Sequence, residues 1–377
     1  MIRTSKCLLL FLLITTLAAC NAFSSTPPSV AGPPAPTAKA TLTALSDPEI
    51  ISRLDTYFTN LAFTGSVLIA RDGKILLQKG YGEADRAQKI PNTERTKFRI
   101  ASVTKQFTAM AILILHSQGK LDLQDRACDY LSTCPPAWQT ITLHHLLTHT
   151  SGIPDYYSSP DWVIYQATPV VPSEIIDHFI DKPLDFQPGE KWNYSNSGYE
   201  VLGAIIEQVS GTTYETFIKE NILVPLKMTG TGYLENTDGL SIGYAGAYTT
   251  LPANFEHPST LFASGGLYST VNDLYLWDQA LSTDKLIPKD LSDKMFTPYI
   301  SIPDMGRITR IGYGYGWLIG EIKNHSMVFH TGRIEGFSAI NAVYPDDKII
   351  VVVLGNQWLG GVNGMVVRLA DILFGDR

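Results

Sequence analysis

A serine and a lysine lie three residues apart in the stretch RIASVTKQFTAMAILIL, which spans residues 99–115. On a helix, side chains three positions apart share a face, with Cβ atoms about 5 to 6 Å apart, so the amine of Lys105 can reach the hydroxyl of Ser102. An apolar wall and the positive end of the helix dipole both favour the neutral amine, which can accept the serine proton. The pair predicts a serine nucleophile that works without histidine.

Two later motifs carry groups that such a serine needs. Tyr194 and Asn196 lie in a loop of turn formers before a predicted helix, where a tyrosine can relay a proton and an asparagine can orient an amide. The run His330-Thr331-Gly332 ends a predicted strand, whose edge can accept a substrate. Each motif alone also fits a structural role: a helix cap, a surface loop or a strand end. Together they point to one active site.

The elements that must position these groups follow from periodicity. Strand patterns occur near both chain ends, and Asp72-Gly73 predicts a hairpin between the first two. The pattern predicts an α+β fold, in which one central antiparallel sheet from both chain ends is flanked by helices and a mostly helical part is inserted over roughly residues 100–300. The expected strands cover residues 65–71, 74–80, 313–319, 327–330, 337–344 and 349–354, and the expected helices 47–58, 103–118, 142–149, 173–182, 197–210, 272–281 and 362–374.

Composition narrows the class of function. The chain has 377 residues, 45% of them hydrophobic, which is enough for a sizeable core. Its formal net charge is -7 and it has no Lys/Arg-rich block, so nucleic acid is not an expected partner. A small molecule or peptide is expected instead, and no feature predicts an oligomeric state.

The N-terminus predicts export. Two basic residues precede an apolar run that ends in Leu17-Ala-Ala-Cys20, which is typical of a signal peptide over residues 1–19. The segment resembles the lipobox of bacterial lipoproteins, which implies a lipidated Cys20 and anchoring in the cell envelope. Asn21 does not resemble an inner-membrane retention signal, so we expect the anchor to lie in the outer membrane, facing the periplasm. An ordinary secretory signal is the alternative. Residues 20–46 then form a Pro/Ala/Ser/Thr-rich linker before a catalytic domain over 47–377.

Two other groups of residues have a structural interpretation. Cys128 and Cys134 bracket a short turn, and in an oxidising compartment this spacing suits a local disulfide, with two free thiols as the alternative. His144, His145 and His149 lack an acidic or cysteine partner at ligand spacing, so we expect them to support a helix end rather than bind metal. No metal or organic cofactor is expected.

The order SVTK, YSN and HTG resembles the three active-site motifs of the serine β-lactamase-like family, in the group of class C β-lactamases and penicillin-binding proteins. The resemblance covers residues 47–377 and implies a β-lactamase/transpeptidase-like fold. Further stretches that resemble family hallmarks are ITLHHLLTHTSG at 141–152, VPLKM at 224–228 and SGGLYST at 264–270.

Carried over to this chain, the resemblance implies that Ser102 attacks a carbonyl and forms an acyl-enzyme. Lys105 and Tyr194 would act as general base and then general acid, and Asn196 would hold the substrate amide. The backbone N–H groups of Ser102 and Arg333 would form the oxyanion hole.

One departure bears on the substrate. Many β-lactamases and carboxypeptidases of this group have lysine where this chain has His330, and histidine is mostly neutral near pH 7. A weaker carboxylate anchor, unless Arg333 restores the charge, favours a small ester or a D-amino-acid-containing peptide over β-lactams and D-Ala-D-Ala peptides. The sequence therefore predicts a serine hydrolase of this family. A module that acylates without turnover, or a structural lipoprotein, are the alternatives.

Overall fold

The computed structural model describes residues 46–377 except 161, 247, 359–360 and 376–377. The expected signal peptide, Cys20 and nearly all of the linker lie outside the described residues. None of the described helices is long and apolar enough to cross a bilayer.

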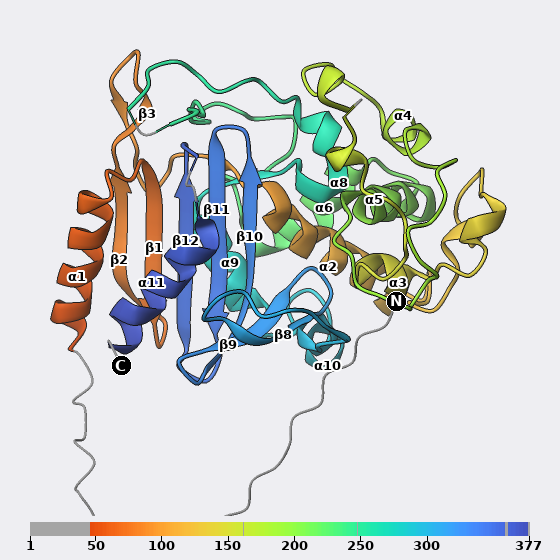
Figure 1. Ribbon diagram of the computed structural model, residues 1–377. Helices are drawn as coiled ribbons and strands as arrows, with labels where there is room; N and C mark the ends of the chain where they lie inside the picture. The colour runs from red at the N-terminus through yellow and green to blue at the C-terminus, as the bar shows by residue number, and fades with distance from the viewer. Residues whose placement is uncertain (1–45, 161, 247, 359–360, 376–377) are drawn as a thin grey trace, which may run out of the picture. The chain divides into compact units, whose positions relative to one another are not determined.

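An eight-stranded antiparallel sheet forms the centre, in the order β2-β1-β12-β11-β10-β9-β8-β7 (Figure 1). Strands from the two chain ends pair near one edge of the sheet, where Gly65 of β1 faces Gly355 of β12 and Arg71 faces Ile349. The sheet strands are β1 (Gly65–Arg71), β2 (Lys74–Tyr81), β7 (Ile300–Ser301), β8 (Thr309–Tyr313), β9 (Leu318–Ile322), β10 (His325–Ile334), β11 (Phe337–Tyr344) and β12 (Ile349–Gly355). Two small ribbons pair β3 (Glu83–Asp85) with β4 (Ile90–Pro91), and β5 (Phe98–Arg99) with β6 (Tyr268–Ser269).

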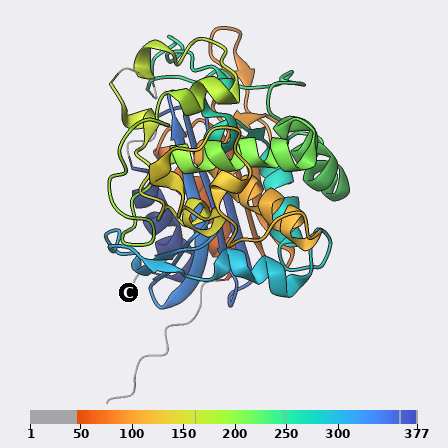
Figure 2. The same cartoon turned by 90° about the vertical axis from the view of Figure 1, so that its right-hand side faces the viewer.

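Both faces of the sheet are covered, which explains why β12 is apolar at nearly every position. Val351 and Val353 pack in one hydrophobic cluster, whereas Val352 and Leu354 pack in the other, as the two-residue period of a strand requires. On the first face lie α1 (Asp47–Asn60) and α11 (Val362–Phe374) (Figure 1). The inserted helical part covers the second face (Figure 2). The α+β fold predicted from the sequence is confirmed.

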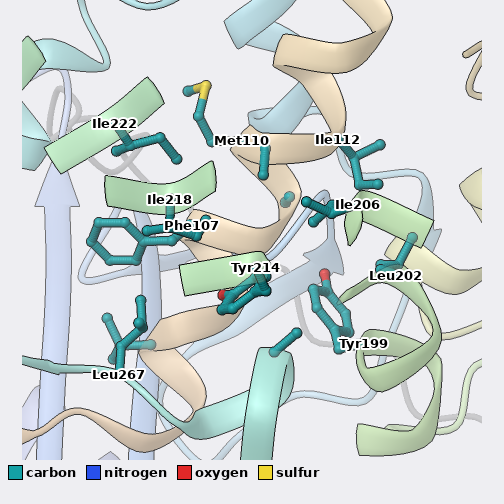
Figure 3. Close-up of a cluster of buried hydrophobic side chains, with 14 of the residues drawn as sticks. Phe107, Met110, Ile112, Tyr199, Leu202, Ile206, Tyr214, Ile218, Ile222 and Leu267 are labelled. Atoms are coloured by element: carbon teal, nitrogen blue, oxygen red, sulfur yellow. The ribbon is translucent and has the colours of Figure 1, made fainter. Parts of the chain in front are cut away.

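The helical part surrounds α2, the helix that carries Lys105. Residues 104–115 of α2 are all buried, and Phe107 stacks on Trp277 with ring centroids 4.4 Å apart. Figure 3 shows α2 side chains facing those of α5 and α6. The helices of this part are α2 (Thr104–Ser117), α3 (Leu143–Leu147), α4 (Pro172–Asp177), α5 (Asn196–Ser210), α6 (Tyr214–Ile218), α7 (Val224–Leu226), α8 (Phe262–Gly265), α9 (Val271–Ala280) and α10 (Lys289–Ser292).

Three expected elements differ in the structure. The strand expected over 327–330 is longer, since β10 runs from His325 to Ile334, so the His330-Thr331-Gly332 motif lies inside the strand and not at its end. The strand expected over 313–319 is broken, because β8 ends at Tyr313 and β9 begins at Leu318. Gly316 lies between them at φ +76°, and a Cβ there would be 2.7 Å from the carbonyl oxygen of Lys105, so the chain turns where it passes the start of α2. The helix expected over 173–182 is shorter, and α4 ends at Asp177.

Candidate active site

Ser102 lies in a tight turn between a strand and a helix. A 3-10 turn, η1 (Ala101–Val103), connects β5 to α2, and Ala101 adopts the left-handed conformation at φ +47°. Its neighbours Ala101 and Val103 are buried, whereas Ser102 is partly exposed. The turn thus presents the serine hydroxyl at the surface of an otherwise buried segment.

Strand β10 packs directly against this turn at Gly332. A Cβ at position 332 would lie 2.1 Å from the carbonyl oxygen of Ile100 and 3.2 Å from the Cβ of Ala101. Since real Cβ atoms never approach an oxygen so closely, this position requires glycine. The contact brings Thr331 and Arg333, on either side of Gly332, to the same cavity as Ser102.

Lys105 is fully buried and points its amine at three oxygens. The Nζ atom donates to Oδ1 of Asn196 and to the carbonyl of Ser264, both at 2.8 Å, and lies 3.5 Å from Oγ of Ser102. Burial lowers the pKa of Lys105 to about 7, while Glu200 and Asp155 act in the opposite direction. A neutral amine has two N–H groups and one lone pair. The two short bonds use both donors, so the lone pair is left for the serine proton.

Tyr194 lies beside the amine and the serine. The Nζ atom of Lys105 is 4.9 Å from the centre of the Tyr194 ring, and the Tyr194 hydroxyl hydrogen-bonds to Ser102. Burial raises the pKa of Tyr194, and the bond to Ser102 partly opposes that shift. The phenol is therefore protonated at neutral pH and able to pass on a proton.

Asn196 is the first residue of α5, and its amide orientation is set by Asp155. The Nδ2 and backbone N–H groups of Asn196 donate to Oδ1 of Asp155, at 3.1 and 2.8 Å. Because a carboxylate only accepts, the amide oxygen must face Lys105. Sequence reasoning missed Asp155, which lies in the irregular segment after α3 and carries no periodic signal.

His330 is buried, and both of its ring nitrogens are engaged. Its Nδ1 lies 2.8 Å from the carbonyl of Thr331, and its Nε2 lies 3.1 Å from the hydroxyl of Tyr313. A carbonyl only accepts, so Nδ1 carries the proton and Nε2 accepts from Tyr313. Burial, with a smaller effect of Lys105, lowers the pKa of His330 to about 3. The side chain is neutral at physiological pH and supplies no fixed charge.

These groups open into a cavity of about 550 Å³. Arg333 borders it, with its guanidinium 4.4 Å from the centre of the Trp358 ring. Trp192 and Tyr157 line the cavity as wall residues. Tyr156, next to Tyr157 in the chain, is instead fully buried and donates to Glu200. The cavity thus combines aromatic walls with one guanidinium among its described lining residues.

The remaining predicted groups lie apart from the serine. Cys128 and Cys134 are joined by a disulfide, with sulfur atoms that pack at the edge of the helical core. His144 bonds to the Tyr315 hydroxyl and His145 caps α3, whereas His149 stacks behind Tyr194 with ring centroids 4.4 Å apart. Within the described ranges, no three His, Cys, Asp or Glu side chains come together as a metal site.

The sheet with helices on both faces and the Ser-Lys-Tyr cluster at the start of the central helix define the chain as a serine hydrolase of the β-lactamase fold. The chain belongs to the β-lactamase family, which matches residues 55–373.

Several relatives are similar over most of their length. A putative penicillin-binding protein, PbpX, of Bacillus subtilis (strain 168) is 34% identical, over 85% of this chain and 78% of the relative. The crystal structure of a penicillin-binding protein from Bacillus halodurans superposes with a TM-score of 0.74 at 30% identity, covering 84% of this chain and 98% of the other. A D-amino acid amidase from Ochrobactrum anthropi SV3 superposes with a TM-score of 0.74 at 25% identity, covering 85% and 99%.

Proposed function

We propose that the protein hydrolyses an amide or ester bond through an acyl-enzyme on Ser102, and that its substrates are small esters or D-amino-acid-containing amides and peptides. The observation that carries the mechanism is the geometry of Lys105, whose two 2.8 Å bonds leave its lone pair for Ser102. The Ser102 oxygen attacks the carbonyl carbon as its proton passes to Lys105, directly or through Tyr194. The same groups return the proton to the leaving amine or alcohol.

The negative charge that forms on the carbonyl oxygen needs donors. Under this proposal the backbone N–H groups of Ser102 and Arg333 supply them, since the contact of Gly332 with Ile100 holds the two segments together. Asn196 binds the substrate amide with its Nδ2 group. Water then attacks the acyl-enzyme, with Lys105 and Tyr194 as base, and releases the acid.

The neutral His330 supports the preference for uncharged acyl donors. Its buried ring offers no cation to a substrate carboxylate. The similarity to a D-amino acid amidase is consistent with an amide substrate of D configuration. The substrate preference can be tested by turnover assays with four compounds: a p-nitrophenyl ester, D-phenylalanine amide, L-phenylalanine amide and nitrocefin. We expect turnover of the ester and the D-amide, with S102A inactive on both. Efficient nitrocefin hydrolysis without ester or amide turnover would contradict it.

A second candidate is stable acylation by a β-lactam, as in a penicillin-binding protein. Two observations favour it: the identity to PbpX, and Arg333 at the cavity, where its guanidinium can face a carboxylate. Intact-mass spectra over time with benzylpenicillin separate the candidates. An adduct that persists for hours supports the binder, whereas an adduct that forms and disappears supports the hydrolase.

We also propose that the mature protein is anchored through Cys20 in the bacterial envelope, at the outer membrane. The support is the motif Leu17-Ala-Ala-Cys20 with Asn21 after it. Metabolic labelling with an alkyne fatty acid should mark the wild-type chain and not the C20S variant. Recovery of the wild-type protein from the soluble periplasmic fraction would contradict the proposal.

A further inference from the structure

Glu200 is a fully buried carboxyl group on α5, one helical turn after Asn196. Its Oε1 accepts from the Tyr156 hydroxyl at 2.9 Å and its Oε2 from the backbone N–H of Ala263 at 3.2 Å. Both partners are neutral. A carboxylate held away from water by neutral donors is costly unless an opposite charge lies near.

The opposite charge available is the amine of Lys105, and the adjacent residues Ala263 and Ser264 contact both groups. Lys105 donates to the carbonyl of Ser264 at 2.8 Å, and the backbone N–H of Ala263 donates to Glu200 at 3.2 Å. Asn196 and Glu200 are four residues apart on α5, so their side chains share the face that meets Lys105. In this dry surrounding a charge on one group acts strongly on the other.

We propose that Glu200 is a positioning residue that holds the Lys105 amine between its charged and neutral forms, and thereby sets the lower pH limit for activation of Ser102. The inference rests on the proposed function in one respect, the role of Lys105 as base. Glu200 itself is not among the residues that line the cavity around Ser102.

The titration behaviour of the cluster agrees with this role. Burial raises the pKa of Glu200 and lowers that of Lys105, and the charge of each group opposes the shift of the other. Asp155 also favours the charged amine and remains in any Glu200 variant. The other titratable groups that face the pair are histidines and tyrosines, and they stay neutral around pH 7. Burial lowers the pKa values of the histidines and raises those of the tyrosines. The groups that face Lys105 are His149, His330, Tyr194 and Tyr199, and those that face Glu200 are Tyr156, Tyr214 and Tyr233.

The test is the pH dependence of Ser102 labelling by a fluorophosphonate probe in E200Q. Glutamine keeps the shape and one of the two acceptor oxygens but removes the negative charge. Without that charge the protonated Lys105 is less favoured, so the neutral amine forms at lower pH. We expect the midpoint of the labelling rate to fall by about one pH unit, a tenfold change in the acid constant.

E207Q is the matched control. Glu207 lies on the same helix, burial also raises its pKa, and its Oε1 accepts from the backbone N–H of Tyr214 at 2.8 Å, whereas Glu200 accepts from Ala263 beside Ser264. Its substitution should leave the midpoint unchanged. A role of Glu200 in packing alone would lower the melting temperature or the amount of active protein without moving the midpoint.

A folded E200Q variant with the wild-type midpoint overturns the proposal. If E200Q does not fold, Y156F replaces it. Losing the Tyr156 donor makes the Glu200 carboxylate less stable and more protonated, so the midpoint should fall again, by less than in E200Q; an unmoved midpoint in Y156F overturns the proposal. Probe labelling does not depend on which substrate is turned over. A failed amide or ester assay and an unmoved midpoint are therefore separate results.

Discussion

Gly332 of β10 packs against Ile100 so closely that a Cβ atom at position 332 would lie 2.1 Å from the Ile100 carbonyl oxygen. This contact holds β10, the strand that borders the cavity, against the turn that carries Ser102. The position of the Arg333 backbone relative to the serine depends on it. Gly332, which the sequence pattern places at a strand end, thus sets the distance between β10 and the turn that carries Ser102.

The G332A variant should lose both stability and reactivity. A methyl group forces β10 away from the turn, and we expect a loss of about 2–4 kcal/mol in the free energy of unfolding, with Ser102 labelling by a fluorophosphonate slowed at least tenfold. Urea unfolding and labelling kinetics measure the two effects. G364A in α11 is the control, because a Cβ there meets nothing within 4 Å and alanine favours a helix by up to about 1 kcal/mol. Labelling of Ser102 at the wild-type rate in G332A would contradict the role of Gly332 in placing β10 beside the serine.

Local patterns in the sequence were sufficient for the fold class, whereas the cluster of Ser102, Lys105 and Tyr194 was predicted from three motifs taken together and from their resemblance to a known family. The apolar run of β12 and the apolar surface of α2 are local signals, and both elements are buried in the structure. The break at Gly316 was not predictable, because residues 313–319 continue a strand-like pattern and only packing on Lys105 turns the chain there.

The polar groups behind the site were missed for a related reason. In the sequence, Glu200 has the pattern of an ordinary polar residue on an amphipathic helix. Its buried environment depends on Ala263 and Ser264, which lie more than sixty residues later in the chain. Likewise, the partner of His330 Nε2 is the hydroxyl of Tyr313, which comes from a different strand. Interactions between distant segments leave no periodic trace in a single sequence.

Arg333 should matter for charged substrates and little for neutral ones. Its guanidinium borders the cavity, so the R333Q variant should react with benzylpenicillin about tenfold more slowly. The rate with a neutral p-nitrophenyl ester should stay within about twofold, since the oxyanion donor at this position is the backbone N–H. R310Q is the control, because Arg310 lies on β8 and pairs with Glu321. Equal slowing with both substrates would show that the side chain has another role.

The disulfide should contribute modestly to stability. Cys128 and Cys134 are six positions apart, and closing so short a loop removes little entropy from the unfolded chain, about 2 kcal/mol. The C128S/C134S double variant should therefore unfold at lower urea concentration and label Ser102 at the wild-type rate. A thiol assay on the wild-type protein under denaturing conditions should detect both cysteines only after reduction. Free thiols without reductant would contradict the pairing.

His330 should cost stability in acid. Because its pKa is lowered to about 3 in the folded protein, the folded state binds fewer protons than the unfolded state between that value and the ordinary histidine pKa of about 6.5. Stability therefore falls as the pH drops through this window, by about 1.4 kcal/mol per unit for one proton. His149, whose pKa burial also lowers, adds a second contribution of the same sign.

The stability of the H330Q variant should depend less steeply on pH than that of the wild type, because the variant lacks one titrating group. Glutamine can accept from Tyr313 and does not titrate, so its free energy of unfolding should fall less steeply between pH 6 and pH 4 than that of the wild type. Urea unfolding at several pH values measures both slopes. H325Q is the control, because His325 lies at the far end of β10 beside Asp347, partly exposed. Parallel slopes in H330Q and the wild type would mean that His330 takes up its proton over the same pH range in the folded and unfolded protein, which would contradict the lowered pKa.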